Sequence, residues 1–235
     1  MIKIAGALFF LLLTGCFMGK AQDTLPIDKF PIQVLGNFKE LKPFILYLTG
    51  DGGWNSFSQQ FCNDIYKEGY SIVALNSRRY FWEAKTPDRF INDLEEIISY
   101  YLKQSQVKEF CIVGYSFGAD VGAFIPAMLS NNLKEKLHPM VLMSPGLSTD
   151  FEVKLMDLLG GPEVSRKYKI LPELDQTTVP ILCIFGEDEE LEIKEYLKES
   201  GKITVKVLDG GHRYNFETQT LVDLIIDKID PVRKN

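Results

Sequence analysis

A serine at position 116 has the surroundings of a catalytic nucleophile. Residues 114–118 read Gly-Tyr-Ser-Phe-Gly, a G-x-S-x-G pattern that directly follows an apolar run and directly precedes a helical pattern. A strand that turns straight into a helix strains its central residue, and the flanking glycines leave room for the turn. The pattern predicts Ser116 as the nucleophile of a hydrolase, at the carboxyl end of a sheet. The alternative is a small residue in an ordinary tight turn.

A serine nucleophile needs a base, and the chain contains two histidines. His138 precedes Pro139 at the start of an apolar run, which indicates a structural role. His212 lies in the glycine-rich stretch 208–216, between the last apolar run and the last helical pattern. An α/β-hydrolase carries its base at this place, so we predict His212 as the general base. The alternative is a solvent-exposed loop histidine.

The acid of a catalytic triad should follow the strand before the one that leads to the histidine. Residues 187–190 read Glu-Asp-Glu-Glu and directly follow the apolar run 180–185. The order serine, acid, histidine is that of the α/β-hydrolases. Asp188 has the commoner residue type and Glu189 the commoner spacing after Gly186, so both remain candidates.

A hydrolase of this type also needs two backbone N–H groups that stabilise the oxyanion. The residue after the nucleophile, Phe117, supplies one. The second should come from the glycine-rich loop 48–54, where Gly50, Asp51 and Gly52 are the candidates. The same glycines would also suit a plain turn. The chemistry needs no metal and no organic cofactor.

These residues require a fold that alternates strands and helices. Continuous apolar runs predict strands at 44–49, 71–75, 110–114, 139–144, 180–185 and 202–208. Helical patterns lie at 57–68, 87–103, 117–129, 189–199 and 216–229. The alternation predicts an α/β-hydrolase fold, a mostly parallel sheet with helices on both faces. Residues 147–178 interrupt it as a short excursion, so we expect a minimal cap or none.

Composition limits the functional classes. The 235 residues, 46% of them hydrophobic, suffice for one domain with a sizeable core. A formal net charge of −6 argues against nucleic acid as a partner. Three cysteines beyond position 16 occupy apolar or helical stretches without metal-ligand spacing, so we predict that Cys62, Cys111 and Cys183 are buried and structural.

The N-terminus has the pattern of a secretory signal. A basic residue, an apolar run too short for a membrane span, and small residues follow one another. Two processing routes fit: a signal peptide at 1–21, or a lipoprotein signal at 1–15 that leaves Cys16 as a lipidated N-terminus. We therefore expect a linker at 22–30 and the hydrolase domain at 31–235. The protein would be exported, either free in the periplasm or anchored to a membrane.

The chain resembles the AcvB/VirJ family of exported bacterial α/β-hydrolases. The resemblance rests on six stretches that extend over nearly all of the predicted mature chain: TGDGGW (49–54), SRRYFW with KTP (77–82 and 85–87), GYSFGAD (114–120), DFEV (150–153), CIFGEDE (183–189) and GGHRYN (210–215). It implies a periplasmic enzyme that hydrolyses the aminoacyl ester of lysyl-phosphatidylglycerol to lysine and phosphatidylglycerol. Ser116 and His212 match the family's nucleophile and base, and the acid carries over only as a member of 187–189.

The implied substrate suggests further binding residues. A lysyl ester carries two ammonium groups, for which Asp51 and Asp120 are candidates. Asp120 would also be stable in the first turn of a helix for electrostatic reasons alone. Arg79, beside three aromatic residues, could bind the lipid phosphate or instead form a structural salt bridge.

Two other functions stay open. A general exported esterase or lipase would use the same triad on a different ester. A non-catalytic protein that interacts with an envelope partner would keep the fold without using the triad. The oligomeric state is not determined by the sequence.

Overall fold

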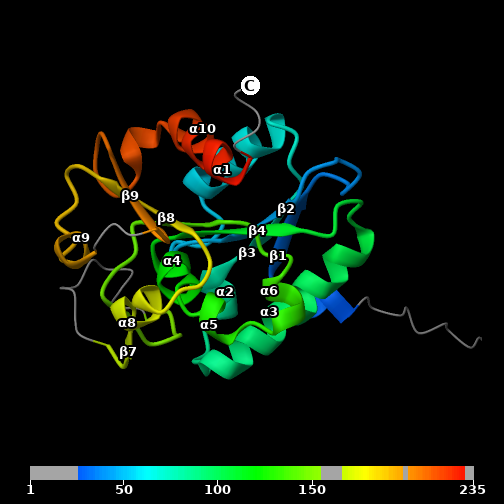
Figure 1. The fold of residues 1–235 in the computed structure, drawn as a ribbon, viewed down its shortest axis with the longest axis horizontal. Helices are drawn as coiled ribbons and strands as arrows, with labels where there is room; N and C mark the ends of the chain where they lie inside the picture. The colour runs from blue at the N-terminus through cyan, green and yellow to red at the C-terminus, as the bar shows by residue number, and fades with distance from the viewer. Residues whose placement is uncertain (1–25, 155–165, 198–200, 231–235) are drawn as a thin grey trace, which may run out of the picture.

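The computed structural model describes residues 26–154, 166–197 and 201–230, and a twisted seven-stranded sheet forms its centre (Figure 1). The strands are β1 (Ile32–Leu35), β2 (Phe44–Leu48), β3 (Ile72–Leu75), β4 (Phe110–Tyr115), β5 (Met140–Met143), β8 (Ile181–Gly186) and β9 (Ile203–Leu208). Their order across the sheet is β1-β3-β2-β4-β5-β8-β9. Only β1 runs antiparallel to its neighbour. The predicted α/β-hydrolase architecture is confirmed.

The continuous apolar runs reflect burial on both faces of the sheet. Every residue of β2, β3, β4, β5 and β8 is buried, whereas the edge strands β1 and β9 are partly exposed. In β2 the side chains of Leu46 and Leu48 join one hydrophobic cluster, and those of Ile45 and Tyr47 join another on the opposite face. A strand between two cores leaves no position for a polar side chain, so its sequence does not alternate.

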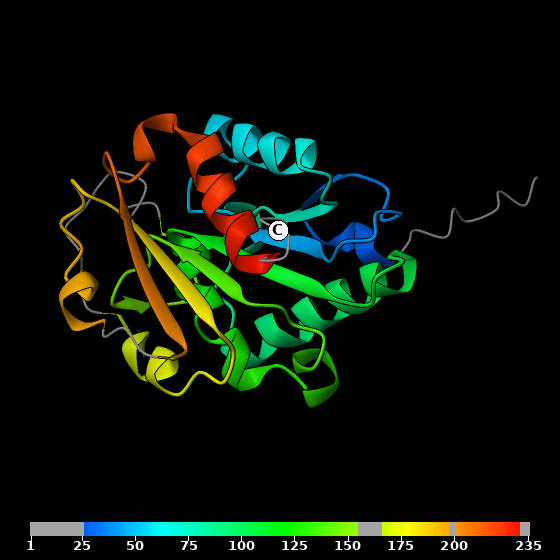
Figure 2. The ribbon, with the colours of Figure 1, turned by 45° about the horizontal axis from the view of Figure 1, so that its top comes forward.

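Two long helices cover one face of the sheet. Helix α1 (Ser56–Lys67) and helix α10 (Thr218–Ile229) lie side by side there, as Figure 2 shows. The Asn55 side chain caps α1 by accepting a hydrogen bond from the Ser58 N–H at 3.1 Å. The apolar sides of both helices, including Phe61 and Ile225, belong to the same buried cluster. This layer supports the loop that leads from β9 into α10.

The other face is covered by α3 and several short helices. Helix α3 (Pro87–Gln104) begins at a Thr86 cap with proline in its first turn and buries Leu94, Ile97 and Ile98. The short helices on this side are α2 (Ser77–Tyr80), α4 (Phe117–Gly122), α5 (Ile125–Met128) and α6 (Asn131–Lys134). The core they share is rich in aromatic rings.

Some predicted boundaries differ from the structure. The helix expected at 117–129 is divided into α4 and α5, and the one expected at 189–199 is reduced to α9 (Ile193–Tyr196). Part of the expected linker is instead ordered: η1 (Pro26–Lys29) is a short 3-10 helix, and the side chains of Ile27 and Phe30 enter the core. The compact domain therefore includes residues before position 31.

The excursion after β5 is small. It contains a two-stranded ribbon of β6 (Ser148–Thr149) and β7 (Tyr168–Lys169), followed by α8 (Leu171–Asp175). Phe151 lies next to the ribbon and is fully buried against Phe81, Phe90 and Phe124. The described part of the excursion is thus anchored on the domain.

The signal predicted at the N-terminus, including Cys16, lies outside the described residues. Within the ranges that the structure describes, no helix combines the length and apolar character that crossing a bilayer requires. Cys62, Cys111 and Cys183 are free and buried, as expected.

Candidate active site

Ser116 occupies a strained turn between β4 and α4. Its backbone has φ 53° and ψ −123°, a conformation that residues with a Cβ rarely adopt. The two flanking glycines are required by space. A Cβ at Gly114 would lie 2.5 Å from the carbonyl oxygen of Gly118, and a Cβ at Gly118 would lie 2.6 Å from the carbonyl carbon of Leu48. The turn therefore presents Ser116 at the carboxyl edge of the sheet.

His212 and Glu189 complete a chain of hydrogen bonds with this serine. His212 Nε2 lies 2.8 Å from Ser116 Oγ. His212 Nδ1 is hydrogen-bonded to Glu189 Oε1 on its other side. Of the two acids left open by the sequence, Glu189 is only 8% exposed and contacts the imidazole. The side chain of Asp188 is exposed, and the structure does not bring it to His212.

The acid is held ionised by its surroundings. Glu189 Oε2 accepts hydrogen bonds from the Gly186 N–H at 2.6 Å and from Ser144 Oγ at 2.9 Å. Burial alone would raise the pKa of Glu189, but the hydrogen bonds from His212, Gly186 and Ser144 lower it below its ordinary value. A carboxylate in this state can fix the imidazole with its Nδ1 proton toward the acid, which leaves Nε2 free to accept a proton from the serine.

A close approach of two loops brings the acid and the histidine together. A Cβ at Gly186 would lie 2.5 Å from the carbonyl oxygen of Gly211, so only glycine fits where the loops after β8 and β9 meet. Tyr115 adds a second support, since its hydroxyl donates to the His212 carbonyl oxygen at 2.9 Å. The tyrosine ring also lies 5.3 Å from the imidazole, measured between centroids. His138, by contrast, pairs with Glu109 at 2.7 Å and takes no part in this site.

The glycine-rich loop after β2 lies against the nucleophile. A Cβ at Gly50 would lie 3.3 Å from the Cβ of Ser116. Among the described residues, no hydrogen-bond acceptor is found for the backbone N–H groups of Gly50, Asp51, Gly52 or Phe117. All four candidate oxyanion donors are therefore available, and Gly50 and Phe117 lie next to the reacting hydroxyl.

A small cavity of about 130 Å³ opens beside the serine. Both acids predicted to bind a cation, Asp51 and Asp120, line this cavity. The full lining is Asp51, Ser116, Phe117, Asp120, Ser148, Thr149, Glu152 and Arg166. Asp120 Oδ1 is fixed by the N–H of Gly146 at 2.7 Å. The last four lining residues belong to the excursion and were missed from the sequence, because two-residue strands show no periodicity.

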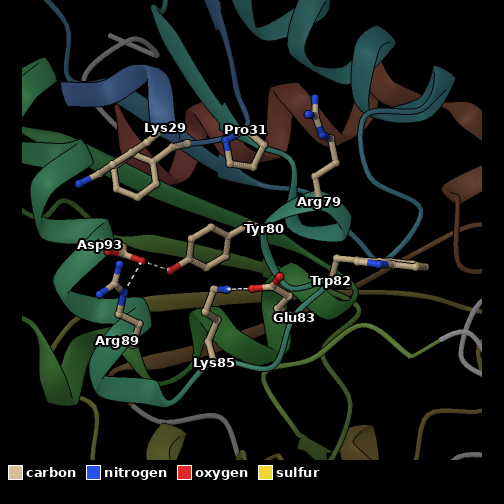
Figure 3. Close-up of a pocket in the computed structure, with 10 residues that line it drawn as sticks. Lys29, Pro31, Arg79, Tyr80, Trp82, Glu83, Lys85, Arg89 and Asp93 are labelled. Atoms are coloured by element: carbon tan, nitrogen blue, oxygen red, sulfur yellow. Dashed lines mark hydrogen bonds and ion pairs between the residues drawn. The ribbon is translucent and has the colours of Figure 1, made fainter. Parts of the chain in front are cut away.

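Arg79 is placed elsewhere. It is exposed and lines a separate cavity of about 410 Å³ together with Lys29, Tyr80, Trp82 and Lys85, among others. Figure 3 shows its side chain extending away from Tyr80 and Lys85. Arg79 is not among the residues that line the cavity beside Ser116, so the structure does not place it where it would meet a group next to the reacting carbonyl.

The aromatic layer between the two cavities is tightly packed. Phe81 lies 4.7 Å from Tyr80 on one side and 5.1 Å from Phe117 on the other, measured between ring centroids. Tyr80 donates to the buried carboxylate of Asp93 at 2.7 Å. The aromatic residues after β3 therefore act mainly in packing, except for Trp82, which is 56% exposed.

Comparisons with solved structures agree with this architecture. VinJ shares 14% sequence identity with a TM-score of 0.64, covering 90% of this chain and 99% of VinJ. Est1E from Butyrivibrio proteoclasticus shares 14% with a TM-score of 0.60, covering 84% of this chain and 93% of Est1E. A thioesterase domain from the curacin biosynthetic pathway shares 14% with a TM-score of 0.59, covering 83% of this chain and 94% of that domain. At these identities the likeness establishes the fold.

The sequence itself gives the family. No curated protein matches the chain. The family described as bacterial virulence protein (VirJ) matches residues 43–233, a range that contains the serine turn, the acid, the histidine and the glycine-rich loop. The chain therefore belongs to the VirJ family of bacterial virulence proteins.

Proposed function

We propose that this protein is a serine hydrolase that cleaves the aminoacyl ester of lysyl-phosphatidylglycerol, releasing lysine and phosphatidylglycerol. The observation that carries the hydrolase reading is the hydrogen-bonded chain from Ser116 through His212 to Glu189. A protein that only binds would not need the strained backbone of Ser116 or a histidine hydrogen-bonded to it. A carboxylesterase and a thioesterase domain among the similar folds are consistent with this class of reaction.

The reaction would proceed through an acyl-enzyme. Ser116 Oγ attacks the ester carbonyl while its proton passes to His212 Nε2, and Glu189 stabilises the resulting imidazolium. The N–H groups of Phe117 and of the loop 50–52 stabilise the negative oxygen. The lipid alcohol leaves with the proton from His212. A water molecule, deprotonated by the same imidazole, then attacks the acyl-enzyme and releases the amino acid.

The cavity beside Ser116 supports an amino acid as the acyl group. Asp51, Asp120 and Glu152 line it and would attract the ammonium groups of a lysyl ester. Arg166 is the cation of the lining, and it is paired with Asp150 at 3.2 Å. A volume of about 130 Å³ suits a small polar acyl group better than a fatty acyl chain. The resemblance to AcvB and VirJ supports the choice of lysine.

We further propose that the protein acts outside the cytoplasm, at a membrane surface that holds the lipid. The signal-like residues 1–21 support export, and Cys16 supports a lipid anchor as an alternative to a free periplasmic form. A net charge of −6 gives no general attraction to an anionic membrane. Recognition of the lipid would therefore depend on local contacts.

The test is lysine release from phosphatidylglycerol vesicles that contain lysyl-phosphatidylglycerol. We expect release by the intact protein and none by Ser116→Ala, with a fluorophosphonate probe labelling only the intact form. Turnover of p-nitrophenyl butyrate without lysine release would replace this proposal with a general esterase. Absence of labelling, with a Ser116→Ala strain that keeps its phenotype, would favour a non-catalytic envelope protein.

A further inference from the structure

We propose that Ser144 is a positioning residue of the triad, and that it fixes the carboxylate of Glu189 toward His212 with Tyr214 behind it. The inference rests on the proposed function, because a triad acid needs positioning only if the triad works. Ser144 lies outside the sequence motifs, and Tyr214 lies within the stretch 210–215, where the sequence assigned it no role. Both are fully enclosed by the fold, with exposures of 3% and 1%.

The contacts form a short buried network. Ser144 directly follows β5 and donates from Oγ to Glu189 Oε2 at 2.9 Å. The Tyr214 hydroxyl lies 2.6 Å from Ser144 Oγ and 3.0 Å from the carbonyl oxygen of Ile184. Since Oε2 is held by Ser144 and by the Gly186 N–H, the carboxylate can present only Oε1 to the imidazole. The network thus selects one orientation of the acid.

The backbone at Ser144 has a conformation that favours glycine over serine. Its φ is 53°, a left-handed conformation that a glycine adopts freely and that a serine adopts with strain. Its N–H donates to the Ile184 carbonyl oxygen at 2.7 Å, an interaction that any residue could make. The side-chain hydroxyl is what a glycine could not supply. Strain that persists at a site touching the triad is the pattern expected of a functional constraint.

A count of the hydroxyl protons shows which group loses a hydrogen bond when the Ser144 hydroxyl is removed. The two hydroxyls carry one proton each, so together they can donate two hydrogen bonds. They make three contacts: Ser144 with Glu189, Ser144 with Tyr214, and Tyr214 with the Ile184 carbonyl. The charged acceptor takes the Ser144 proton, so Tyr214 donates to one of its two neighbours. Without the serine, Tyr214 still has the Ile184 carbonyl as an acceptor. The cost therefore falls on Glu189 and not on a stranded tyrosine.

The experiment compares Ser144→Gly and Ser144→Ala with the wild type. We expect kcat for p-nitrophenyl butyrate to fall about 10- to 100-fold in both, the loss expected from one hydrogen bond to a charged group, with KM within about twofold. The glycine variant should melt at a higher temperature than the alanine variant, because both lose the hydroxyl but only glycine relieves the backbone strain. Ser77→Ala is the matched control, since its buried hydroxyl has no hydrogen-bond partner among the described residues, and it should keep wild-type kcat.

A spectroscopic measurement separates this inference from the proposed function. The chain has two histidines, so the Nδ1 proton of His212 can be assigned by NMR with a His138→Asn variant. We expect a protected, downfield proton in the wild type and in Ser77→Ala, and fast exchange in Ser144→Gly. If the wild type hydrolyses no ester but shows this difference, the proposed function fails, while the claim that Ser144 orients the Glu189 carboxylate toward His212 stands. If Ser144→Gly keeps the protected proton, or keeps kcat within twofold of an active wild type, the positioning role is wrong.

Discussion

Replacement of Glu189 by glutamine should nearly abolish hydrolysis while leaving the fold intact. Oε2 accepts from the Gly186 N–H and from Ser144, whereas Oε1 faces His212 alone. An amide has one oxygen and one NH2 group, so the oxygen will take the side with two donors. The NH2 group then faces His212 Nδ1 and forces that nitrogen to act as an acceptor. The proton moves to Nε2, which can no longer accept from Ser116.

A wrong imidazole tautomer costs a serine hydrolase about 10⁴-fold in kcat, which corresponds to roughly 5.5 kcal/mol of transition-state stabilisation. Asp188→Asn is the matched control. Its side chain is exposed, and its backbone N–H donates to the Gly210 carbonyl oxygen at 3.0 Å, a bond that the substitution leaves in place. We expect kcat within about twofold of the wild type, since exposed substitutions away from a site have small effects.

The assay is kcat for p-nitrophenyl butyrate and for lysyl-phosphatidylglycerol, with circular dichroism to show that each variant is folded. The reasoning is refuted if Asp188→Asn loses activity to the same degree as Glu189→Gln. It is also refuted if folded Glu189→Gln keeps more than about a tenth of the wild-type kcat. An imidazole that carries its proton on Nε2 cannot act as the base, so it does not allow that much residual activity.

The remaining predictions concern backbone strain, packing and pH. Ser116→Gly should raise the free energy of unfolding by about 1 kcal/mol by relieving φ 53°, and should eliminate fluorophosphonate labelling; urea unfolding with no gain would contradict the strain. Gly118→Ala should lower the melting temperature, since its Cβ would meet the backbone of Leu48 at 2.6 Å and overpacking costs roughly 1–3 kcal/mol; an unchanged value would contradict the close approach. Burial would raise the pKa of Asp150, but hydrogen bonds, the largest from Lys154, lower it from 3.8 to about 2. Its stabilising effect is therefore complete above pH 3.8 and is lost as the pH falls through about 2, so denaturant titrations between pH 5 and 2 should show a smaller loss of stability for Asp150→Asn than for the wild type.

The sequence predicts those parts of the site that depend on local geometry. Steric constraints fix the backbone conformation of a glycine-flanked serine between a strand and a helix. The structure brings His212 to this serine from a loop 96 residues away, as expected. The mostly parallel sheet also follows from the alternation of apolar runs and helical patterns, whereas strand β1 and the order of the strands were not predicted. These features depend on the backbone path, which the hydrophobic pattern largely determines.

The sequence could not predict in the same way which of several neighbouring side chains points into the site. Asp188 and Glu189 are adjacent in one loop, and Glu189 turns inward to contacts with the Gly186 N–H and Ser144 that only the folded chain brings together. The positions of Thr149 and Glu152 depend on a ribbon of two-residue strands, which is too short for any periodic signal. Arg79 follows a predicted strand, but the orientation of an exposed arginine depends on its rotamer and not on the chain path.

The three thiols inside the core have a consequence for biogenesis. Cys62, Cys111 and Cys183 come from α1, β4 and β8 and are fully enclosed once the layers have closed. If the protein is exported, as proposed, and crosses the membrane unfolded, all three thiols would meet an oxidising compartment before they are covered. A disulfide formed at that moment would join β4 to β8, or α1 to one of these strands, before the layers have closed. If the protein is exported as proposed, its maturation would require rapid closure of the sheet, or a reductase that reverses such errors.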